Sequence, residues 1–240
     1  MDWLEGEIIG FDKPYRWTSF DVVGKARWLL SHRLGYKKIK VGHTGTLDPL
    51  ATGVVVVCTG KKTKCIDELQ THVKEYVATL QLGATTPSFD LEKPVDATYP
   101  TGHITRTLID EVIPTFLGEQ WQVPPVFSAV KVDGKRAYKL ARKGETPELK
   151  PKKLVIDEIE VLSFDKEKMQ LVIRVVCSKG TYIRALARDI GERLHSGAHL
   201  IQLRRTRVGA LRAEDCMQFI DFEKLIEEEK TKQNNETQSI

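Results

Sequence analysis

The most chemically unusual part of the 240-residue chain is a glycine-rich segment around Asp48. Gly42, Gly45 and Gly53 fall within twelve residues, which allows tight turns and close approach of another molecule to the backbone. Asp48 precedes Pro49, which restricts its backbone to extended conformations. A carboxylate on a stiff loop can act as a nucleophile or a general base. Local chemistry alone favours a simpler interpretation, an aspartate that caps a turn.

A second segment, residues 177–184, connects an expected strand to an expected helix. Thr181 is the expected N-cap residue, and Arg184 then falls in the first helical turn. A cation near a helix N-terminus is electrostatically unfavourable, so Arg184 suggests a fixed anionic partner, either a carboxylate or a phosphate. A surface arginine is the alternative, and the local sequence alone favours it.

Two further groups could contact a nucleic acid. Tyr76 lies on an expected strand, where a core aromatic is more common than a base-stacking residue. Leu203, Arg204 and Arg205, followed by Arg207, place cations along another expected strand. These cations could follow a phosphate backbone or could be solvated.

The charge distribution is more informative than the formal net charge of +4. Between residues 127 and 153 there are nine Lys or Arg residues and three acidic residues, a local excess of six. A concentrated basic stretch is typical of a phosphate-binding surface, although a solvated lysine-rich face is the alternative.

Cysteine spacing and hydropathy exclude other classes of protein. The four cysteines form no C-x-x-C pair, so the pattern of a structural metal site is missing and reduced thiols in a cytoplasmic protein are expected. The N-terminus lacks the apolar segment of a signal peptide. The longest apolar run, residues 54–58, is far too short to cross a membrane.

The elements that must position these residues follow from hydrophobic periodicity. Helices are expected from Thr18 or Ser19 to Gly35 and over 63–70, 108–117, 181–195 and 213–230, with a break possible at Pro114. Strands are expected over 7–11, 54–58, 74–82, 154–162, 169–177 and 200–212. Because helices and strands do not alternate regularly, the sequence predicts an α+β fold with a mixed, mainly antiparallel sheet flanked by helices. One domain is expected over 1–230, followed by a disordered tail over 231–240.

Together, these segments resemble a known family, the bacterial TruB-type tRNA pseudouridine synthases, which modify the uridine at position 55 in the T loop. The likeness extends in order over nearly the whole chain. Its motifs are Asp12-Lys13-Pro14, Trp17-Thr18-Ser19, Gly42 to Gly53, Thr59 to Lys64, Lys74-Glu75-Tyr76, Pro124 to Lys131, Gly134 to Tyr138, Ser178 to Arg184, Gly197 to Leu200 and Leu203-Arg204-Arg205. The segment Thr85 to Asp90 departs from a more polar segment common in the family.

The resemblance implies a reaction in which a flipped-out uridine loses its glycosidic bond, rotates and is rejoined through C5. Asp48 would be the essential catalytic carboxylate, acting on the base, on the sugar or in an elimination. Arg184 would pair with Asp48 and keep it ionised. Tyr76 would stack on the uracil and assist proton movement.

The resemblance also implies a substrate site and an RNA surface. Tyr182 and Leu203 would line the uracil pocket, and His43 would help to open the T loop. Residues of about 124–153 would form a thumb-like insertion that closes over the RNA. The RNA backbone would be contacted by Lys61, Lys64, Lys135, Arg136, Arg142, Arg204 and Arg205.

The resemblance further implies a short form that lacks a C-terminal PUA module. It implies a monomer that binds the T arm of tRNA and needs no metal, organic cofactor or protein partner. A tRNA-binding or tRNA-folding chaperone that uses the same cleft without chemistry is the alternative. A carboxylate-dependent hydrolase or lyase acting on small nucleosides is a remoter one, because a small substrate needs no extended basic surface.

Overall fold

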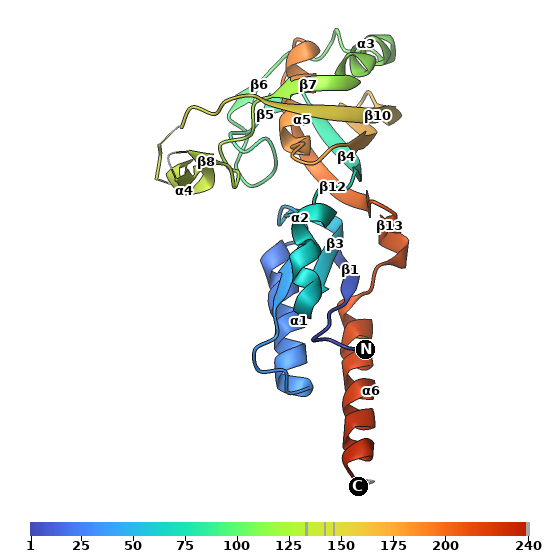
Figure 1. Ribbon diagram of the computed structural model, residues 1–240. Helices are drawn as coiled ribbons and strands as arrows, with labels where there is room; N and C mark the ends of the chain where they lie inside the picture. Colours follow the sequence, from blue (N-terminus) through green and yellow to red (C-terminus); the bar gives the residue numbers. More distant parts are fainter. Residues whose placement is uncertain (133, 142, 146, 239–240) are drawn as a thin grey trace. The chain divides into compact units, whose positions relative to one another are not determined.

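The computed structural model describes residues 1–132, 134–141, 143–145 and 147–238. Its contacts divide the chain into two compact units (Figure 1). The first unit comprises Met1–Lys74 and Arg204–Ile240, and the second comprises Glu75–Leu203. The sequence analysis expected one domain over 1–230. Among the described residues, no helix is both long and apolar enough to span a bilayer.

The first unit is built on strand β3 (Ala51–Thr59), in which every residue but one is buried. Two strands pair with it in antiparallel register, β1 (Ile8–Lys13) and β2 (Val41–His43). Strand β12 (Ala198–Val208) also borders β3, and its end turns back through β13 (Leu211–Arg212). The remaining elements are the 3-10 helices Gly60–Cys65 and Ala213–Asp215 and the helices α1 (Ser19–Arg33), α2 (Ile66–Leu69) and α6 (Phe219–Gln238).

Helix α1 begins where the sequence predicted it. Thr18 is the N-cap residue, and its hydroxyl accepts a hydrogen bond from the backbone of Asp21, whose carboxylate accepts one from the Thr18 amide. This reciprocal capping satisfies amides that have no partner within the helix. Helices α1 and α6 contact each other, and Phe222 of α6 packs against Trp3 and Phe11 in the core of this unit.

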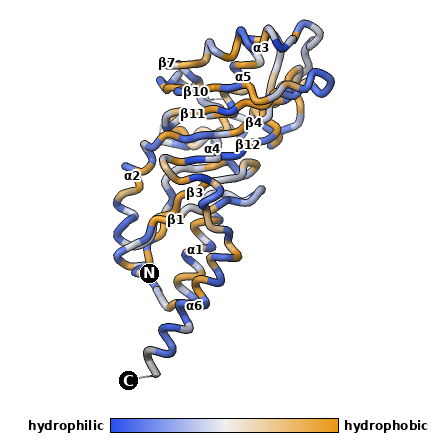
Figure 2. Tube along the Cα trace, turned by 90° about the vertical axis from the view of Figure 1, so that its right-hand side faces the viewer, coloured by the Kyte–Doolittle hydropathy of each residue, from blue (hydrophilic) through white to orange (hydrophobic). Residues whose placement is uncertain are grey.

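The expected disordered tail is not what the structure shows for residues 231–238. Helix α6 continues through Gln238, and its last turns are hydrophilic (Figure 2). The segment contains neither proline nor glycine, the two residues that most oppose a helix interior, and residues 231–235 are exposed. Polarity alone therefore did not predict where the helix ends.

The second unit is a sheet in the order β12-β4-β11-β10-β7, covered by helices. Its main strands are β4 (Lys74–Leu82), β7 (Gly118–Gln122), β10 (Lys152–Asp165) and β11 (Gln170–Cys177). Strand β10 pairs in antiparallel register with both β11 and β7. Helix α5 (Ile183–Arg193) and helix α3 (Arg106–Val112), which continues as the 3-10 helix Ile113–Phe116, complete its main elements. The expected break at Pro114 is this change of helix type.

The predicted α+β class with a mainly antiparallel sheet is confirmed. Strand β7 was not predicted, because Gly118 looked like the end of a helix rather than the start of a strand. Two short strands, β5 (Ala84–Thr85) and β6 (Ala97–Thr98), pair within a stretch expected to be loop. The stretch of about 124–153 contains β8 (Lys131–Val132), β9 (Lys135–Arg136) and α4 (Ala137–Ala141).

Candidate functional site

The loop that carries Asp48 is bound through its backbone to side chains from other elements of the first unit. Ser19, at the start of α1, accepts a hydrogen bond from the Leu47 amide at 2.8 Å and donates its hydroxyl to the Leu47 carbonyl oxygen at 3.2 Å. On the other side of Asp48, the Pro49 carbonyl oxygen accepts from the Arg16 amide at 2.8 Å and from Lys13 Nζ at 3.3 Å. The residues flanking Asp48 are therefore fixed in position.

Arg205 binds the start of the same loop. Its guanidinium donates to the carbonyl oxygens of Val54 at 2.6 Å, Gly45 at 3.1 Å and Thr46 at 3.4 Å. The residue is only 2% exposed, so its guanidinium binds backbone carbonyl groups inside the first unit rather than a partner at the surface. The expected contact of Arg205 with an RNA backbone is corrected accordingly.

Gly53 explains how β12 comes so close to this loop. Its φ is +106°, and a Cβ built at this position would lie 2.1 Å from the carbonyl oxygen of Arg205. Only glycine combines that backbone conformation with so close an approach. The glycine spacing in the sequence thus reflects close packing at Gly53 and at Gly42, which lies in β2 against Ile66, whereas a Cβ at Gly45 would make only ordinary contacts.

Lys13 is a buried cation that the sequence analysis did not single out as a site residue. Its Nζ also donates to the carbonyl oxygens of Pro14 at 3.0 Å and Trp17 at 2.6 Å. Burial lowers the pKa of this amine to about 8, although the nearby Asp48 carboxylate opposes that shift. The alternation of β1 offered a signal, because Lys13 continues the buried face of Ile9 and Phe11.

His43 lies at the end of β2 and is partly buried. Its Nδ1 accepts a hydrogen bond from the Gly45 amide at 3.2 Å, so the neutral ring carries its proton on Nε2. Burial and the nearby Arg205 lower the pKa of His43. A neutral imidazole suits contact with a base better than contact with a phosphate.

The expected RNA-backbone cations differ in their surroundings. Arg204 makes a two-pronged ion pair with Asp12, at 2.8 and 3.1 Å, and Lys61 pairs with Glu5. Lys64, Lys135 and Arg136 are exposed, on the 3-10 helix after β3 and on β9. Arg142 lies outside the described residues.

Arg184 is the central charged residue of the second unit. It is 4% exposed and lies in the first turn of α5. Its Nε is 3.6 Å from Asp90 Oδ2, and its guanidinium donates to the carbonyl oxygens of Ser88 and Phe127. The sequence argument for an anionic partner is met within this unit by Asp90, in the segment that departs from the family pattern. The N-cap residue is Tyr182 rather than Thr181, whose hydroxyl donates to the Ser178 carbonyl oxygen.

Tyr76 and Leu203 lie on neighbouring strands, β4 and β12, and both are buried. Tyr182 is partly exposed at the start of α5. Asp48 and His43 belong to the first unit, whereas Tyr76, Tyr182, Arg184 and Leu203 belong to the second. Sequence reasoning missed Ser19, Lys13 and Asp90 as partners, because their contacts join residues distant along the chain.

Comparison with known proteins gives a consistent result over most of the chain. A family model described as TruB family pseudouridylate synthase (N terminal domain) matches residues 32–183, and one described as tRNA pseudouridylate synthase B C-terminal domain matches 184–238. The tRNA pseudouridine synthase B of Phocaeicola vulgatus is 64% identical over 95% of this chain and 97% of its own. That of Flavobacterium johnsoniae is 48% identical over 94% of this chain and 98% of its own.

A solved structure shares the fold. A chain in the crystal structure of a Cbf5-Nop10-Gar1 complex superimposes with a TM-score of 0.69 and 32% identity. The alignment covers 92% of this chain and 54% of that one, so this chain spans about half the length of its structural relative.

Proposed function

The chain belongs to the TruB family of pseudouridylate synthases, and we propose that it converts the uridine at position 55, in the T loop of tRNA, to pseudouridine. It is an isomerase of the tRNA pseudouridine synthase B type. The sequence that carries this proposal is shared along nearly the full length of both this chain and its relatives. Beyond membership of the family, the proposal states which uridine is modified and what individual residues do.

The observation that carries the chemistry is the fixed backbone on both sides of Asp48. The Leu47 and Pro49 contacts with Ser19, Lys13 and Arg16 restrict where the carboxylate can point. A preorganised carboxylate needs no reorganisation when it meets the reacting atom. Asp48 is therefore proposed as the essential group acting on a uridine that has left its stack.

Residues of the second unit supply the remaining roles in this proposal. Tyr76 stacks on the uracil and assists proton movement, Tyr182 and Leu203 line the uracil pocket, and Arg184 pairs with Asp48. Burial of Arg184 beside Asp90 supports a positioned guanidinium rather than a mobile surface charge. The neutral ring of His43 supports a role beside a displaced base.

The test of the reaction uses unmodified tRNA labelled with tritium at C5 of uridine. Forming the new C5–C1′ bond releases that tritium, so wild-type protein is expected to release one tritium per tRNA. Asp48→Asn should lower the release rate by about 1,000-fold or more, because a positioned acid or base contributes on that order. Asp67→Asn, at an exposed position on α2, is the matched control and should leave the rate unchanged.

Two outcomes would contradict the proposal. A tRNA with cytidine in place of uridine 55 should release no tritium, so continued release would place the reaction at another uridine. Folded wild-type protein that retards tRNA in a gel but releases no tritium would instead indicate the chaperone function.

The proposed RNA surface has a separate test. Lys135 and Arg136 are both exposed on β9, and replacing both with alanine should weaken tRNA binding and reduce its salt dependence. Each lost phosphate contact lowers the slope of log affinity against log salt by about 0.7 to 0.9. Lys166→Ala, on an exposed turn, is the control. An unchanged slope in the double variant would show that β9 is only a solvated face.

A further inference from the structure

The side-chain amide of Gln122, the last residue of β7, binds the backbone of Tyr182. Its Oε1 accepts a hydrogen bond from the Tyr182 amide at 2.9 Å, and its Nε2 donates to the Tyr182 carbonyl oxygen at 3.2 Å. The same carbonyl oxygen accepts the Leu186 amide at 3.0 Å, which closes the first turn of α5. Gln122 therefore binds both peptide groups of the residue at which this helix begins.

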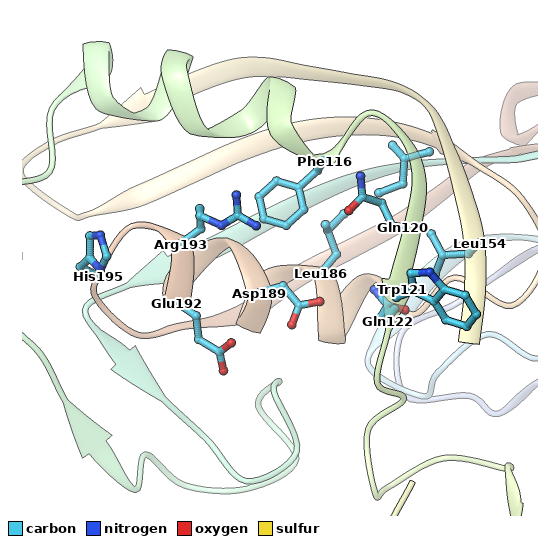
Figure 3. A pocket seen from close by; sticks show the side chains of 11 residues that line it. Phe116, Gln120, Trp121, Gln122, Leu154, Leu186, Asp189, Glu192, Arg193 and His195 are labelled. Atoms are coloured by element: carbon cyan, nitrogen blue, oxygen red, sulfur yellow. The ribbon is translucent and has the colours of Figure 1, made fainter. Parts of the chain in front are cut away.

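The side chain of Gln122 is shielded from solvent over nearly all of its surface. It is 4% exposed. Figure 3 shows it beside the first turn of α5, at the edge of a pocket of about 400 Å³ that Leu154 and Leu186 also line. Leaving a buried amide or carbonyl group without a hydrogen-bond partner destabilises the folded protein. The amide of Gln122 is thus a specific partner of Tyr182.

Other contacts connect the same segment to the sheet, but at different residues. Ser178 accepts the Val155 amide with its hydroxyl at 2.9 Å and donates its own amide to the Val155 carbonyl oxygen at 2.9 Å. Arg188 donates to the Val123 carbonyl oxygen at 3.2 Å. These contacts hold Ser178 and Arg188, on either side of Tyr182 along the chain, whereas Gln122 binds Tyr182 itself.

We propose that Gln122 is a positioning residue for the isomerisation, acting through the backbone of Tyr182. Two hydrogen bonds to the amide and carbonyl of one residue fix both of its peptide planes, and hence the direction of its Cα–Cβ bond. Gln122 therefore sets where the Tyr182 ring meets the uracil and where Arg184, two residues later, enters the first helical turn. This inference rests on the proposed roles of Tyr182 and Arg184.

The chain contains a matched control on the same strand. Gln120 lies two positions earlier on β7, and its Nε2 donates to the carbonyl oxygens of Thr115 at 3.3 Å and Leu117 at 3.1 Å. Its amide therefore bonds to backbone within its own turn rather than to α5. Substitutions of Gln120 report the loss of a comparable side-chain amide without any effect on Tyr182.

The experiment compares Gln122→Met and Gln122→Glu with Gln120→Met and Gln120→Glu in the tritium-release assay. Both Gln122 variants should lower kcat at neutral pH by about 10- to 100-fold, the scale of a misplaced catalytic group. KM should change little, because tRNA affinity is dominated by phosphate contacts elsewhere. Thermal unfolding of each variant identifies any that fails to fold.

Gln122→Glu carries a signature that a general loss of stability would not produce. An ionised carboxylate cannot donate to the Tyr182 carbonyl oxygen, whereas the protonated acid can, with its other oxygen still accepting the Tyr182 amide. Its kcat relative to wild type should therefore recover as the pH falls from about 8 to about 5, the range in which a buried glutamate titrates. Gln122→Met should show no recovery.

The surrounding charged groups do not confuse that comparison. Asp189, Glu192, Arg193 and His195 line the same pocket, and Lys152 is the register partner of Gln122 on β10. These groups are present both in wild type and in Gln122→Met. Only the introduced carboxyl group distinguishes the Gln122→Glu profile.

The outcomes separate this inference from the proposed function. Wild-type protein without tritium release would overturn the proposed function itself. Active wild type with Gln122 variants that match the Gln120 variants, or with a Gln122→Glu profile parallel to that of Gln122→Met, would overturn the role of Gln122. If the Gln122 variants do not fold, the rate of hydrogen exchange at the Tyr182 amide of the wild-type protein tests the contact instead. A protected Tyr182 amide supports the contact, and exchange at the rate of an exposed loop amide overturns it.

Discussion

The loop that carries Asp48 and the segment that carries Arg184 are fixed by opposite arrangements of charge. Around Asp48, two buried cations and a hydroxyl bind backbone carbonyl groups beside the proposed catalytic residue. Around Arg184, the proposed site residue is itself the buried cation, and backbone carbonyl groups and Asp90 bind it. In the first region these contacts bind the backbone beside the proposed site residue, and in the second the side chain of the proposed site residue makes them itself.

This difference predicts how far activity and stability can be separated. Replacing the Asp48 side chain leaves the hydrogen bonds to the backbone of Leu47 and Pro49 in place. Replacing Arg184 removes the donor to the Ser88 and Phe127 carbonyl oxygens and the partner of Asp90, so buried polar groups are left without partners.

The largest expected effect is therefore that of Arg184→Met on stability. Removing one partner of a buried ion pair should cost about 3 to 5 kcal/mol of unfolding free energy, because it leaves Asp90 without its partner in a buried site. Asp48→Asn should destabilise the protein less than Arg184→Met does, because the contacts to the backbone of Leu47 and Pro49 remain. It should still lower the rate of tritium release by about 1,000-fold or more. Urea unfolding of both variants is the measurement. Equal destabilisation by the two would remove the distinction between the regions.

Arg205→Met should have the next largest effect on the unfolding free energy. It leaves three backbone carbonyl groups in the first unit without their cationic partner, at a cost of about 3 kcal/mol. Tritium release should fall as well, because Gly45 and Thr46 lead into the loop of Asp48. Arg212→Met, at an exposed position on β13, is the control. A variant as stable as this control would show that the carbonyl contacts of Arg205 contribute nothing.

Ser19→Ala should lower the unfolding free energy by less than Arg205→Met does. It removes both hydrogen bonds to the backbone of Leu47 and should cost about 1 to 2 kcal/mol. The rate of tritium release should fall more than tRNA binding, because Asp48 follows Leu47 directly. Ser31→Ala, at a half-buried position on the same helix, should change stability by less than about 0.5 kcal/mol. Unaltered turnover in Ser19→Ala would separate this hydroxyl from the position of Asp48.

The smallest effect is a pH dependence caused by Lys13. Its pKa of about 8 in the folded protein is below the ordinary value of 10.5. Between those values the folded protein has released the proton and the unfolded chain retains it. Unfolding then takes up a proton, so the unfolding free energy should rise with pH across this window and be flat with respect to Lys13 below it.

The measurement is urea unfolding of wild type and Lys13→Met at a series of pH values from 7 to 10.5. Other lysines and tyrosines titrate in both proteins, so only the difference between the two unfolding free energies reports Lys13. That difference should shift in favour of wild type as the pH rises. A constant difference would show that the buried amine keeps its ordinary pKa.

Hydrophobic periodicity predicted the long strands and most of the helices of this protein, including the whole of β4, and proline chemistry predicted the break at Pro114. Periodicity did so because the burial of a face depends on residues two or four positions apart. The same alternation indicates that Lys13 is buried, since this residue continues the apolar face of β1. Local chemistry singled out Asp48 and Arg184 but favoured a turn cap and a surface arginine, and the resemblance instead implied catalytic roles for them.

Only the tertiary structure decided which groups bind those candidates. Arg205 lies 160 positions from Gly45 along the chain, and Gln122 lies 60 positions from Tyr182. No periodicity links such residues, because a backbone carbonyl looks the same at every position and accepts whichever donor the fold brings to it. The sequence thus determined the elements and the reactive residue types, and packing between distant strands and helices determined how each one is supported.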